Sequence, residues 1–493
     1  MGRARGRAVN ADDQQSRPAL ARRVAWNTAA QTAARITTLG FAFLATVLLT
    51  RHLGVDGYGD YTAVLVYVTL FVVFFDLGTY TVLVRELSQG LGSPSELVGK
   101  ALGLRFLLAL VVAGVAAGLA PLLYGSAGDE RLRAGIFIGL FFIVFSAVGT
   151  TFAAPFQARL RMDRPAASEV ISQAFLVGTI VLLVAADASF ESIIVAFVAA
   201  AAVNAAVLLA FLLREGGIRL QVDWPFWRRL LVTSLPLGLA LVLNTIYFRI
   251  DALLLSLLKE SEEVGIYGLA YRFLEMATPF GYFFVASVFP PLSAAAAAGD
   301  ASLVRDLTQR SFDVLAVAAI ALVAAVTARA GDIAELVGGS EFVDAGTPLT
   351  IVIVGAGLAF VTTYFAYLLV AINRQRAILT LSAATLAFNV ALNLVLIPPY
   401  GYVAAAAVAT TSEALLLAGS LVLAYRHAGF VASMRVPLRA LAAGAVMFVA
   451  ALLLPIHVVP AILVAFGLYL VGLYVLRVHD ALDLAAVVAA LRR

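Results

Sequence analysis

Apolar runs that are long enough to cross a bilayer follow one another along this chain. A backbone surrounded by lipid must satisfy its hydrogen bonds internally, so such runs form helices or a closed barrel. A spanning helix needs about 20 apolar residues, whereas a barrel strand needs about 10 that alternate strictly. The runs are long and do not alternate, which predicts an all-α polytopic membrane protein. The fourteen runs lie near residues 24–50, 60–83, 100–123, 134–156, 168–186, 190–213, 230–258, 264–289, 312–330, 346–371, 376–397, 402–425, 436–454 and 457–477.

Arginine and lysine fall mainly in every other gap between these runs. Of the 34 basic residues, 26 lie in gaps on one side, 5 on the other and 3 inside runs. The larger set includes Arg85, Lys100 and Arg105, which we assign to one gap. Short cytoplasmic loops retain positive charge. The asymmetry therefore predicts about fourteen transmembrane helices in a plasma membrane, with both termini in the cytoplasm.

Composition agrees with this class and excludes several others. Hydrophobic residues make up 62% of the chain and charged residues 13%, with a mean hydropathy of +0.98, whereas soluble domains are about half apolar and a quarter charged. The net charge of +4 lies on short loops, so it does not indicate nucleic-acid binding. No metal-ligand spacing, nucleophile elbow or phosphate-binding glycine loop is present. We therefore expect no catalytic residue, no metal, no cofactor and no enzyme activity.

The longest polar interruption inside the chain, residues 214–229, divides it. Tryptophans beside arginines, as in residues 224–229, are typical of a helix at the cytoplasmic membrane interface. Glycine–tyrosine turns at residues 57–61 and 264–267 precede equivalent runs on either side, which favours a parallel repeat of six helices. The predicted segments are a cytoplasmic basic tail (1–23), an N-terminal six-helix lobe (24–213), an interfacial linker (214–229), a C-terminal six-helix lobe (230–425), two further helices (426–478) and a cytoplasmic amphipathic tail (479–493).

Three groups of residues, in order along the chain, carry a resemblance to a known family. They are Asn27, Leu53-Gly54, Tyr58-Gly59, Asp76-Leu77-Gly78 and Arg85-Glu86; Leu235-Pro236, Arg249-Ile250-Asp251, Gly265-Ile266-Tyr267, Ala270-Tyr271-Arg272 and Phe289-Pro290; and Asn389, Asn393, Ile397-Pro398, Tyr400-Gly401, Ala405-Ala406, Ala409-Thr410 and Glu413.

This pattern resembles the polysaccharide-transporter branch of the multidrug/oligosaccharidyl-lipid/polysaccharide exporter superfamily, the Wzx-type oligosaccharide flippases. The resemblance covers essentially the whole chain. It departs at Ala404, where the family commonly has a second glycine. It implies two six-helix lobes around a central cavity, two extra C-terminal helices, and movement of lipid-linked sugars.

Three arginines lie inside the apolar runs. An ionisable group at the bilayer centre costs several kcal/mol, so it faces a wet cavity or a partner. Arg35 lies about 11 residues, or roughly 16 Å, into its run. Arg249 and Arg272 lie at similar depths in antiparallel neighbours, close to Asp251 and Glu275. One interpretation is a cationic site for a diphosphate head group, since guanidinium binds phosphate oxygens bidentately.

The other interpretation is an internal ion-pair network of Arg249 and Arg272 with Asp251 and Glu275, which would hold two helices together. For Arg35 we favour the functional interpretation, because no acid lies within a helical turn of it. Tyrosines offer hydroxyls and ring faces to sugars. The predicted substrate-binding residues are Arg35, Arg249, Arg272, Asp251, Glu275, Tyr271, Tyr247 and Tyr61.

Several other polar or conformational features have simpler interpretations. Pro279, followed by Gly281, is a predicted hinge in its helix, with a static kink as the alternative. Asp76 is expected to pair at an interface or turn. Asn389 and Asn393 lie one turn apart and are expected to bond a neighbouring helix. The role of Glu413 is open.

The leading hypothesis for function is a flippase that moves a polyprenyl-linked oligosaccharide from the cytoplasmic to the outer leaflet, by alternating access of a cationic cavity, for surface glycan synthesis. The alternatives are a lipid II flippase or a cation-coupled drug exporter of the same superfamily. A membrane glycosyltransferase or polymerase is disfavoured, because the longest outer loop is only roughly residues 331–345. The predicted partners are the lipid-linked oligosaccharide, membrane lipids and glycan-assembly proteins, and no nucleic acid.

Overall fold

The computed structural model describes residues 2–125 and 129–478, with side chains from residue 30 onward. The predicted amphipathic tail at 479–493 lies outside the described residues. Helices make up nearly all of the described chain and no strand occurs in it, which confirms the all-α prediction. The helices are α1 (Gly2–Asp76), α2 (Thr79–Ser88), α3 (Pro94–Leu123), α4 (Glu130–Gly139), α5 (Phe141–Ala158), α6 (Asp163–Ala185), α7 (Phe190–Leu213), α8 (Trp224–Leu258), α9 (Ser261–Ala297), α10 (Ala301–Thr327), α11 (Ala330–Gly338), the 3-10 helix η1 (Ser340–Ala345), α12 (Gly346–Ala371), α13 (Gln375–Ala428), α14 (Arg435–Leu453) and α15 (Val458–Val475).

Twelve helical segments of the described chain are long and apolar enough to cross a membrane. Two of them are too long for one crossing. The 54 residues of α13 extend roughly 80 Å, against a hydrocarbon core of about 30 Å. Both α13 and α1 contain one glycine with non-helical angles, Gly401 and Gly54, where the chain turns. Counting the parts on either side of each turn as separate spans gives the fourteen predicted from the sequence.

Large apolar side chains are exposed on many of these helices. Leu122 is 78% exposed and Leu182 is 72% exposed, for example. In water, such continuous apolar surface would drive aggregation. We conclude that lipid solvates these faces, as the composition predicted.

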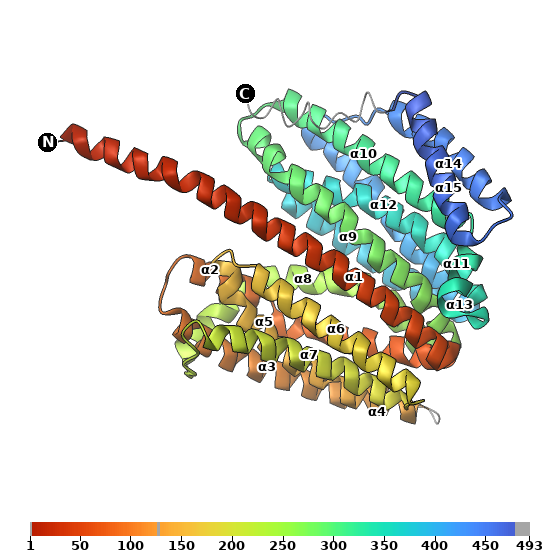
Figure 1. Ribbon diagram of the computed structural model, residues 1–493, viewed down its shortest axis with the longest axis horizontal. Coiled ribbons are helices and arrows are strands. Elements are labelled where there is room, and N and C mark those ends of the chain that lie inside the picture. The colour runs from red at the N-terminus through yellow and green to blue at the C-terminus, as the bar shows by residue number, and fades with distance from the viewer. Residues whose placement is uncertain (1, 126–128, 479–493) are drawn as a thin grey trace. The chain divides into compact units, whose positions relative to one another are not determined.

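The first of two compact units comprises residues up to His52 together with Val64–Ile246. In it α5 packs against α3 and α7, and α6 packs against α7 (Figure 1). Phe152 and Phe156 of α5 meet Leu208 and Leu212 of α7 in one apolar cluster. These contacts hold the unit together by burial of side chains between neighbouring helices.

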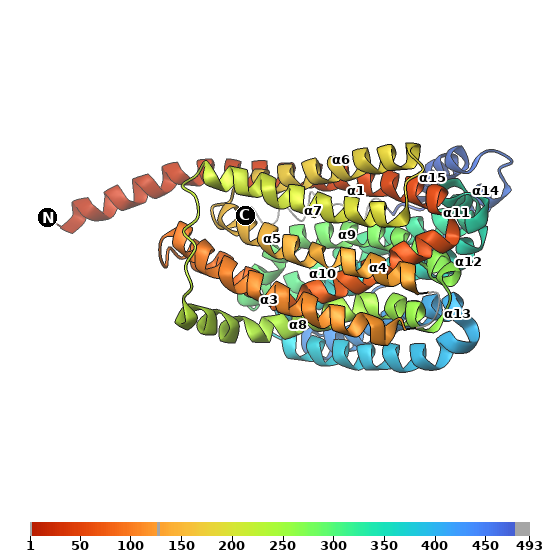
Figure 2. The ribbon, with the colours of Figure 1, turned by 90° about the horizontal axis from the view of Figure 1, so that it is seen from below.

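The second unit comprises Leu53–Ala63 and the chain from Tyr247 onward. Here α12 is central: it packs against α9, α10 and α13. The last two spans, α14 and α15, lie together (Figure 2), and both pack on α10. Tyr469 of α15 donates a hydrogen bond to the Val317 carbonyl of α10 at 2.8 Å, which fixes this pair to the unit.

Glutamates cap the chain where the two long helices turn. After Gly54, which has a φ of +68°, the Val55 N–H donates to Glu341 Oε2 at 3.1 Å. After Gly401, which has a φ of +56°, the Tyr402 N–H donates to Glu263 Oε2 at 3.0 Å. Both glycines have left-handed backbone angles that other residues adopt only with strain. Each carboxylate satisfies an N–H that the interrupted helix leaves without its usual partner.

The two glycine–tyrosine segments that suggested a repeat, 57–61 in α1 and 264–267 in α9, are helical and not turns, and they lie against each other within the second unit. A side chain at Gly59 would collide with the Ser261 carbonyl, and a side chain at Gly265 would collide with the Val55 carbonyl. Asp60 accepts a hydrogen bond from the Ser261 hydroxyl at 2.6 Å. The glycines therefore permit a close helix crossing of the small-residue type.

The structure corrects the assignment of two basic residues to a loop. α3 begins at Pro94, six residues earlier than expected, so Lys100 and Arg105 lie within the helix. The Nζ of Lys100 lies 2.8 Å from Asp223 Oδ2, and the resulting hydrogen bond lowers the pKa of the Asp223 carboxyl. Arg105 is fully buried. It belongs with the intramembrane charges and not with the loop charges.

The predicted orientation can be tested on serines that the structure exposes in connecting segments. Cysteines replacing Ser189 or Ser340 should react with a membrane-impermeant thiol reagent in intact cells. Cysteines replacing Ser93, Ser302 or Ser433 should react only after permeabilisation. All five positions are exposed, and the chain contains no cysteine of its own, so each label reports one site. Labelling of the second group in intact cells would show that the orientation is wrong.

Candidate functional site

Arg249 and Arg272 share one carboxylate in the second unit. Arg249 of α8 and Arg272 of α9 each place Nη1 2.8 Å from an oxygen of Glu275, Arg249 from Oε1 and Arg272 from Oε2. Glu275 follows Arg272 by three residues on the same helix, which brings those two side chains to one face. The three side chains are 30%, 29% and 24% exposed. These three side chains carry a net charge of +1, which the nearby Asp251 offsets in part, and they remain partly open.

Asp251 does not join this cluster as the ion-pair interpretation expected. Its carboxylate accepts hydrogen bonds from the Tyr267 hydroxyl and from the Ala252 N–H, the latter at 2.8 Å. The side chain of Tyr267 reaches Asp251 from α9, one turn before Tyr271. Among the described residues, Glu275 is the acid that pairs directly with both arginines, whereas Asp251 interacts with the charge of Arg249 without a direct ion pair.

The three predicted tyrosines are largely engaged with the protein. The Tyr247 hydroxyl donates to Glu413 Oε1 at 2.9 Å, and the Tyr271 hydroxyl donates to the Phe248 carbonyl. Tyr61 is buried and stacks on Tyr58, with ring centroids 5.9 Å apart. Ring faces and edges, more than hydroxyls, are what these residues offer to a ligand.

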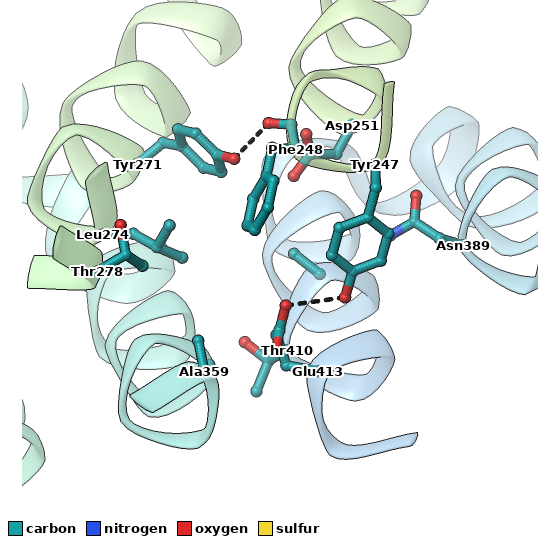
Figure 3. A pocket seen from close by; sticks show the side chains of 12 residues that line it. Tyr247, Phe248, Asp251, Tyr271, Leu274, Thr278, Ala359, Asn389, Thr410 and Glu413 are labelled. Carbon is teal, nitrogen blue, oxygen red and sulfur yellow. Dashed lines mark hydrogen bonds between the residues drawn. The ribbon is translucent and has the colours of Figure 1, made fainter. Parts of the chain in front are cut away.

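A pocket in the second unit collects several of these residues (Figure 3). Tyr247, Asp251 and Tyr271 were predicted site residues, and Glu413 and Asn389 join them from α13. In Figure 3, Glu413 and Tyr247 meet at one side of the pocket while Tyr271 meets Phe248 at the other. The pocket is lined by Tyr247, Phe248, Asp251, Tyr271, Leu274, Thr278, Gly355, Ala359, Asn389, Ala409, Thr410 and Glu413.

The pocket combines two buried acids with amide and hydroxyl oxygens. Asp251 and Glu413 are 3% and 7% exposed. Behind them Asn389 donates to the Ser412 hydroxyl at 3.1 Å and Asn393 donates to Asn389 Oδ1 at 3.0 Å. Ser412 lies in the span that follows Gly401, so Asn389 bonds a neighbouring span as expected. An array of oxygen acceptors of this kind suits a cation or a proton.

Arg35 lies in the first unit and has a partner that its own helix does not supply. Its Nη1 is 3.6 Å from Glu169 Oε1 of α6, and both side chains are 46% exposed. This distance is longer than the 2.8 Å pairs of the second unit. The guanidinium is consequently only loosely held and accessible.

Pro279 and Gly281, the predicted hinge, lie inside a continuous α9 of 37 residues. A side chain at Gly281 would approach the Phe360 backbone of α12 within 3.2 Å. Gly281 therefore also permits close packing between two helices of the second unit.

One cluster was missed by the sequence analysis. Arg105 of α3 donates to Asp76 Oδ1 and to Thr79 Oγ1, both at 2.6 Å, and to Thr150 Oγ1 at 2.8 Å. Asp76 is thereby confirmed as a pairing group. The available signal was the position of Arg105, eleven residues into a helix once its start is placed at Pro94.

Two protein-family models match this chain. The model of the family described as "Polysaccharide biosynthesis protein" matches residues 24–296, and the model described as "MatE" matches residues 236–395. No curated protein matches the chain. These two family matches overlap and together extend from the first span into α13.

Solved membrane transporters are similar in fold. The lipid II flippase MurJ in an inward closed conformation is 13% identical, covers 91% of this chain and 97% of its own, and has a TM-score of 0.76. An inward-facing multidrug resistance MATE transporter is 12% identical, with 81% and 98% covered and a TM-score of 0.66. A mutant of the Vibrio cholerae MATE transporter VcmN is 16% identical, with 84% and 97% covered and a TM-score of 0.58. At these identities the likeness shows the fold alone.

We expect Glu275→Gln to destabilise the second unit, because it leaves two guanidiniums without their shared counter-charge. Removing one partner of a fully buried pair costs about 3–5 kcal/mol, and partial exposure should reduce this to about 2 kcal/mol. Thermal unfolding of the purified protein in detergent measures the change. Asp306→Asn, which breaks an exposed i,i+4 pair with Arg310, is the matched control and should cost less than about 0.5 kcal/mol. Equal melting temperatures for the two variants would contradict a bridging role for Glu275.

Proposed function

Because the chain belongs to the polysaccharide biosynthesis protein family, within the multidrug/oligosaccharidyl-lipid/polysaccharide exporter superfamily, we propose that it flips a polyprenyl-linked oligosaccharide from the cytoplasmic to the outer leaflet. The family resemblance predicted from the sequence is confirmed at this level, and the chain is a membrane transporter or flippase of that superfamily. The oligosaccharide cargo is our proposal.

The observation that carries the proposal is the sharing of Glu275 by Arg249 and Arg272. One carboxylate cannot neutralise two guanidiniums, so a positive charge and several N–H donors remain for an anion. Guanidinium donors match phosphate oxygens in pairs and stay charged at any relevant pH. A diphosphate or phosphate linking a sugar to a polyprenyl chain supplies such oxygens. The partial exposure of all three side chains leaves access for it.

Arg35, in the first unit, is also a partly exposed arginine with donors left for an anion. Its pairing with Glu169 at 3.6 Å is loose, and it is nearly half exposed. A phosphate oxygen at about 2.8 Å would be a closer acceptor than this carboxylate. We therefore propose that Arg35 binds a phosphate oxygen of the head group within the first unit.

Ring faces next to the arginine cluster suit the sugar part. Tyr58 and Tyr61 stack within the second unit. Aromatic rings bury apolar area with a specific geometry and little conformational entropy. Sugars present C–H faces that pack on such rings. Tyr58 and Tyr61 cover each other and are buried, so we propose this role for Tyr247, which is partly exposed and lines the pocket.

A second candidate function, cation-coupled drug export, is favoured by the pocket that contains Asp251 and Glu413. Two buried acids beside amide and hydroxyl oxygens attract a cation. The same pocket would serve a flippase driven by a cation gradient, so the cargo itself must be measured.

We expect Arg249→Ala to abolish most transport without loss of folded protein. The substitution leaves Glu275 paired one-to-one with Arg272, so the cluster becomes neutral and the fold keeps its pair. Loss of charge-assisted hydrogen bonds to phosphate should reduce transport about 10- to 100-fold. The assay is translocation of a fluorescent polyprenyl-diphosphate oligosaccharide in reconstituted vesicles. Arg249→Lys should recover part of the rate, since lysine keeps the charge but lacks the bidentate geometry.

Arg310→Ala is the control, because Arg310 forms an exposed pair near a helix end and should leave transport unchanged. Full transport by Arg249→Ala at normal abundance would contradict the proposed site. Efflux of a cationic dye from the same vesicles, with no movement of the lipid-linked sugar, would favour the drug-export alternative.

The proposed hinge in α9 gives a separate prediction. Proline lacks the N–H of a helical hydrogen bond and kinks the helix, so Pro279→Ala should straighten and stiffen this part of α9. We expect transport to slow severalfold while the melting temperature stays equal or rises. Pro290→Ala in the same helix is the matched control. An unchanged transport rate for Pro279→Ala would favour the static kink.

A further inference from the structure

The second membrane span is interrupted between α1 and α2. α1 ends at Asp76 and α2 begins at Thr79, and the two residues between them have left-handed backbone angles: Leu77 has a φ of +41° and Gly78 a φ of +74°. Glycine adopts such angles readily, but a leucine there is strained. Strain of this kind persists only where surrounding contacts impose it.

Arg105 imposes the break, because its guanidinium binds both sides of it. Nη1 lies 2.6 Å from Asp76 Oδ1 before the break and 2.6 Å from Thr79 Oγ1 after it. Nη2 lies 2.8 Å from Thr150 Oγ1 of α5. The other oxygen of Asp76 accepts the Gly78 N–H at 3.1 Å. One fully buried charge thus joins α1, α2 and α5 at the interruption.

The guanidinium is not fully satisfied in this arrangement. Arg105 Nε is buried and has no hydrogen-bond partner among the described residues. The rings of Phe75 and Tyr80 lie 5.4 and 6.0 Å from its central carbon. Unsatisfied buried donors are rare in proteins, and each one needs an explanation. A second arrangement of the span, in which the donor finds a partner, would provide one.

α2 is a short, separate element with contacts of its own. It packs on α3 and α5, and Leu83 is completely buried in a cluster with Phe226 and Leu230 of α8 (Figure 1). At its far end Glu86 lies 3.5 Å from Arg229. At the break, a side chain on Gly238 of α8 would collide with the backbone of Leu77. α2 is therefore held at both ends and along one face.

We propose that residues 76–78 form a two-state joint, with Arg105 as its positioning residue, and that α2 moves about this joint to open and close the cytoplasmic end of the transport path. This inference rests on the proposed function and on the predicted orientation, which places α2 at the cytoplasmic side. In the second state Leu77 and Gly78 take helical angles and α1 continues into α2. That change relieves the strain at Leu77 but separates Thr79 from Arg105.

Each state has stabilising interactions that the other lacks, and we expect the two sets to be of similar size. The kinked state gains the Arg105 bonds to Thr79 and the buried contacts of Leu83, and it carries the strain of Leu77. The straight state loses those contacts and gains a continuous helix. Elements that switch need such a balance, within a few kcal/mol.

Two substitutions should shift this balance in opposite directions. Arg105→Met removes the group that joins the two sides, so the straight state should become more populated. Leu77→Gly removes the strain of the kinked state and adds a poor helix former to the straight one, so the kinked state should become more populated. The readout is the labelling rate of a single cysteine at Leu83, which reacts only when α2 leaves its cluster. We expect labelling to become about tenfold faster with Arg105→Met and about tenfold slower with Leu77→Gly.

A cysteine at Ile194 of α7 controls for general loosening of the fold. Ile194 is completely buried in the same unit, where it faces Gly139 of α4 and not α2. Its labelling should not change with either substitution, and Arg105→Lys should give an intermediate rate at Leu83. Equal acceleration at both cysteines would mean that Arg105 only stabilises the fold, and unchanged labelling at Leu83 would mean that α2 does not move. Either result overturns the joint.

Transport measurements connect the joint with function and keep the two proposals separate. Leu77→Gly should slow translocation of the fluorescent polyprenyl-diphosphate oligosaccharide about tenfold at normal abundance, matching the labelling change. Normal translocation by Leu77→Gly would overturn a role for the joint in transport. Opposite labelling shifts, in a protein whose unsubstituted form does not move that lipid, would support the joint and reject the proposed cargo.

Discussion

The free-energy cost of a charged group in hydrocarbon organises this molecule more than any other single term. That cost is several kcal/mol per group, so a charge persists within a span only beside a partner or in a hydrated space. The described arginines inside spans follow this rule in three different ways. Arg105 is fully buried with Asp76, Arg249 and Arg272 share Glu275, and Arg35 pairs loosely with Glu169. The degree of neutralisation differs, and with it the chemistry that each site offers.

The differences in neutralisation distinguish charges that support the fold from charges that we propose bind a ligand. Arg105 has a one-to-one carboxylate partner and no exposure, so it has nothing left for a ligand except one unsatisfied donor toward its own surroundings. The Arg249 and Arg272 cluster has two cations for one anion and is partly open. Excess charge together with access is the physical mark of a binding site, whereas neutrality with burial is the mark of an internal support.

The sequence predicted the spans well because length and hydropathy are properties of single segments. The alternation of basic gaps and the family resemblance identified the class of protein, and the fold agrees. The partners that a residue has on other helices were harder to predict from the sequence. Glu169 is 134 positions from Arg35, and no spacing along one helix reveals it. Which acid pairs with both arginines depends on how α8 and α9 are rotated about their axes. In the structure this rotation places Asp251 against Tyr267 and Glu275 between Arg249 and Arg272. Arg105 was counted with the gap charges because it lies near the predicted start of its run, 100–123. α3 begins at Pro94, which places Arg105 eleven residues into the helix.

A transporter must release what it binds, and if Arg249 and Arg272 bind a phosphate as we propose, the carboxylate of Glu275 provides a means of release. With no anion present, both guanidiniums rest on Glu275, so the empty site does not hold two unpaired charges. A phosphate must then compete with Glu275 for the donors, and its net gain is only the difference between the two sets of hydrogen bonds. Binding that is favourable enough to load and weak enough to unload is what conduction and transport require. Two arginines with no carboxylate would bind a diphosphate more tightly but would cost more to fold and would release it more slowly. Under the proposed function, Glu275 therefore sets the affinity of the site for a phosphate as well as the stability of the cluster, and this would account for an acid within a site that binds an anion.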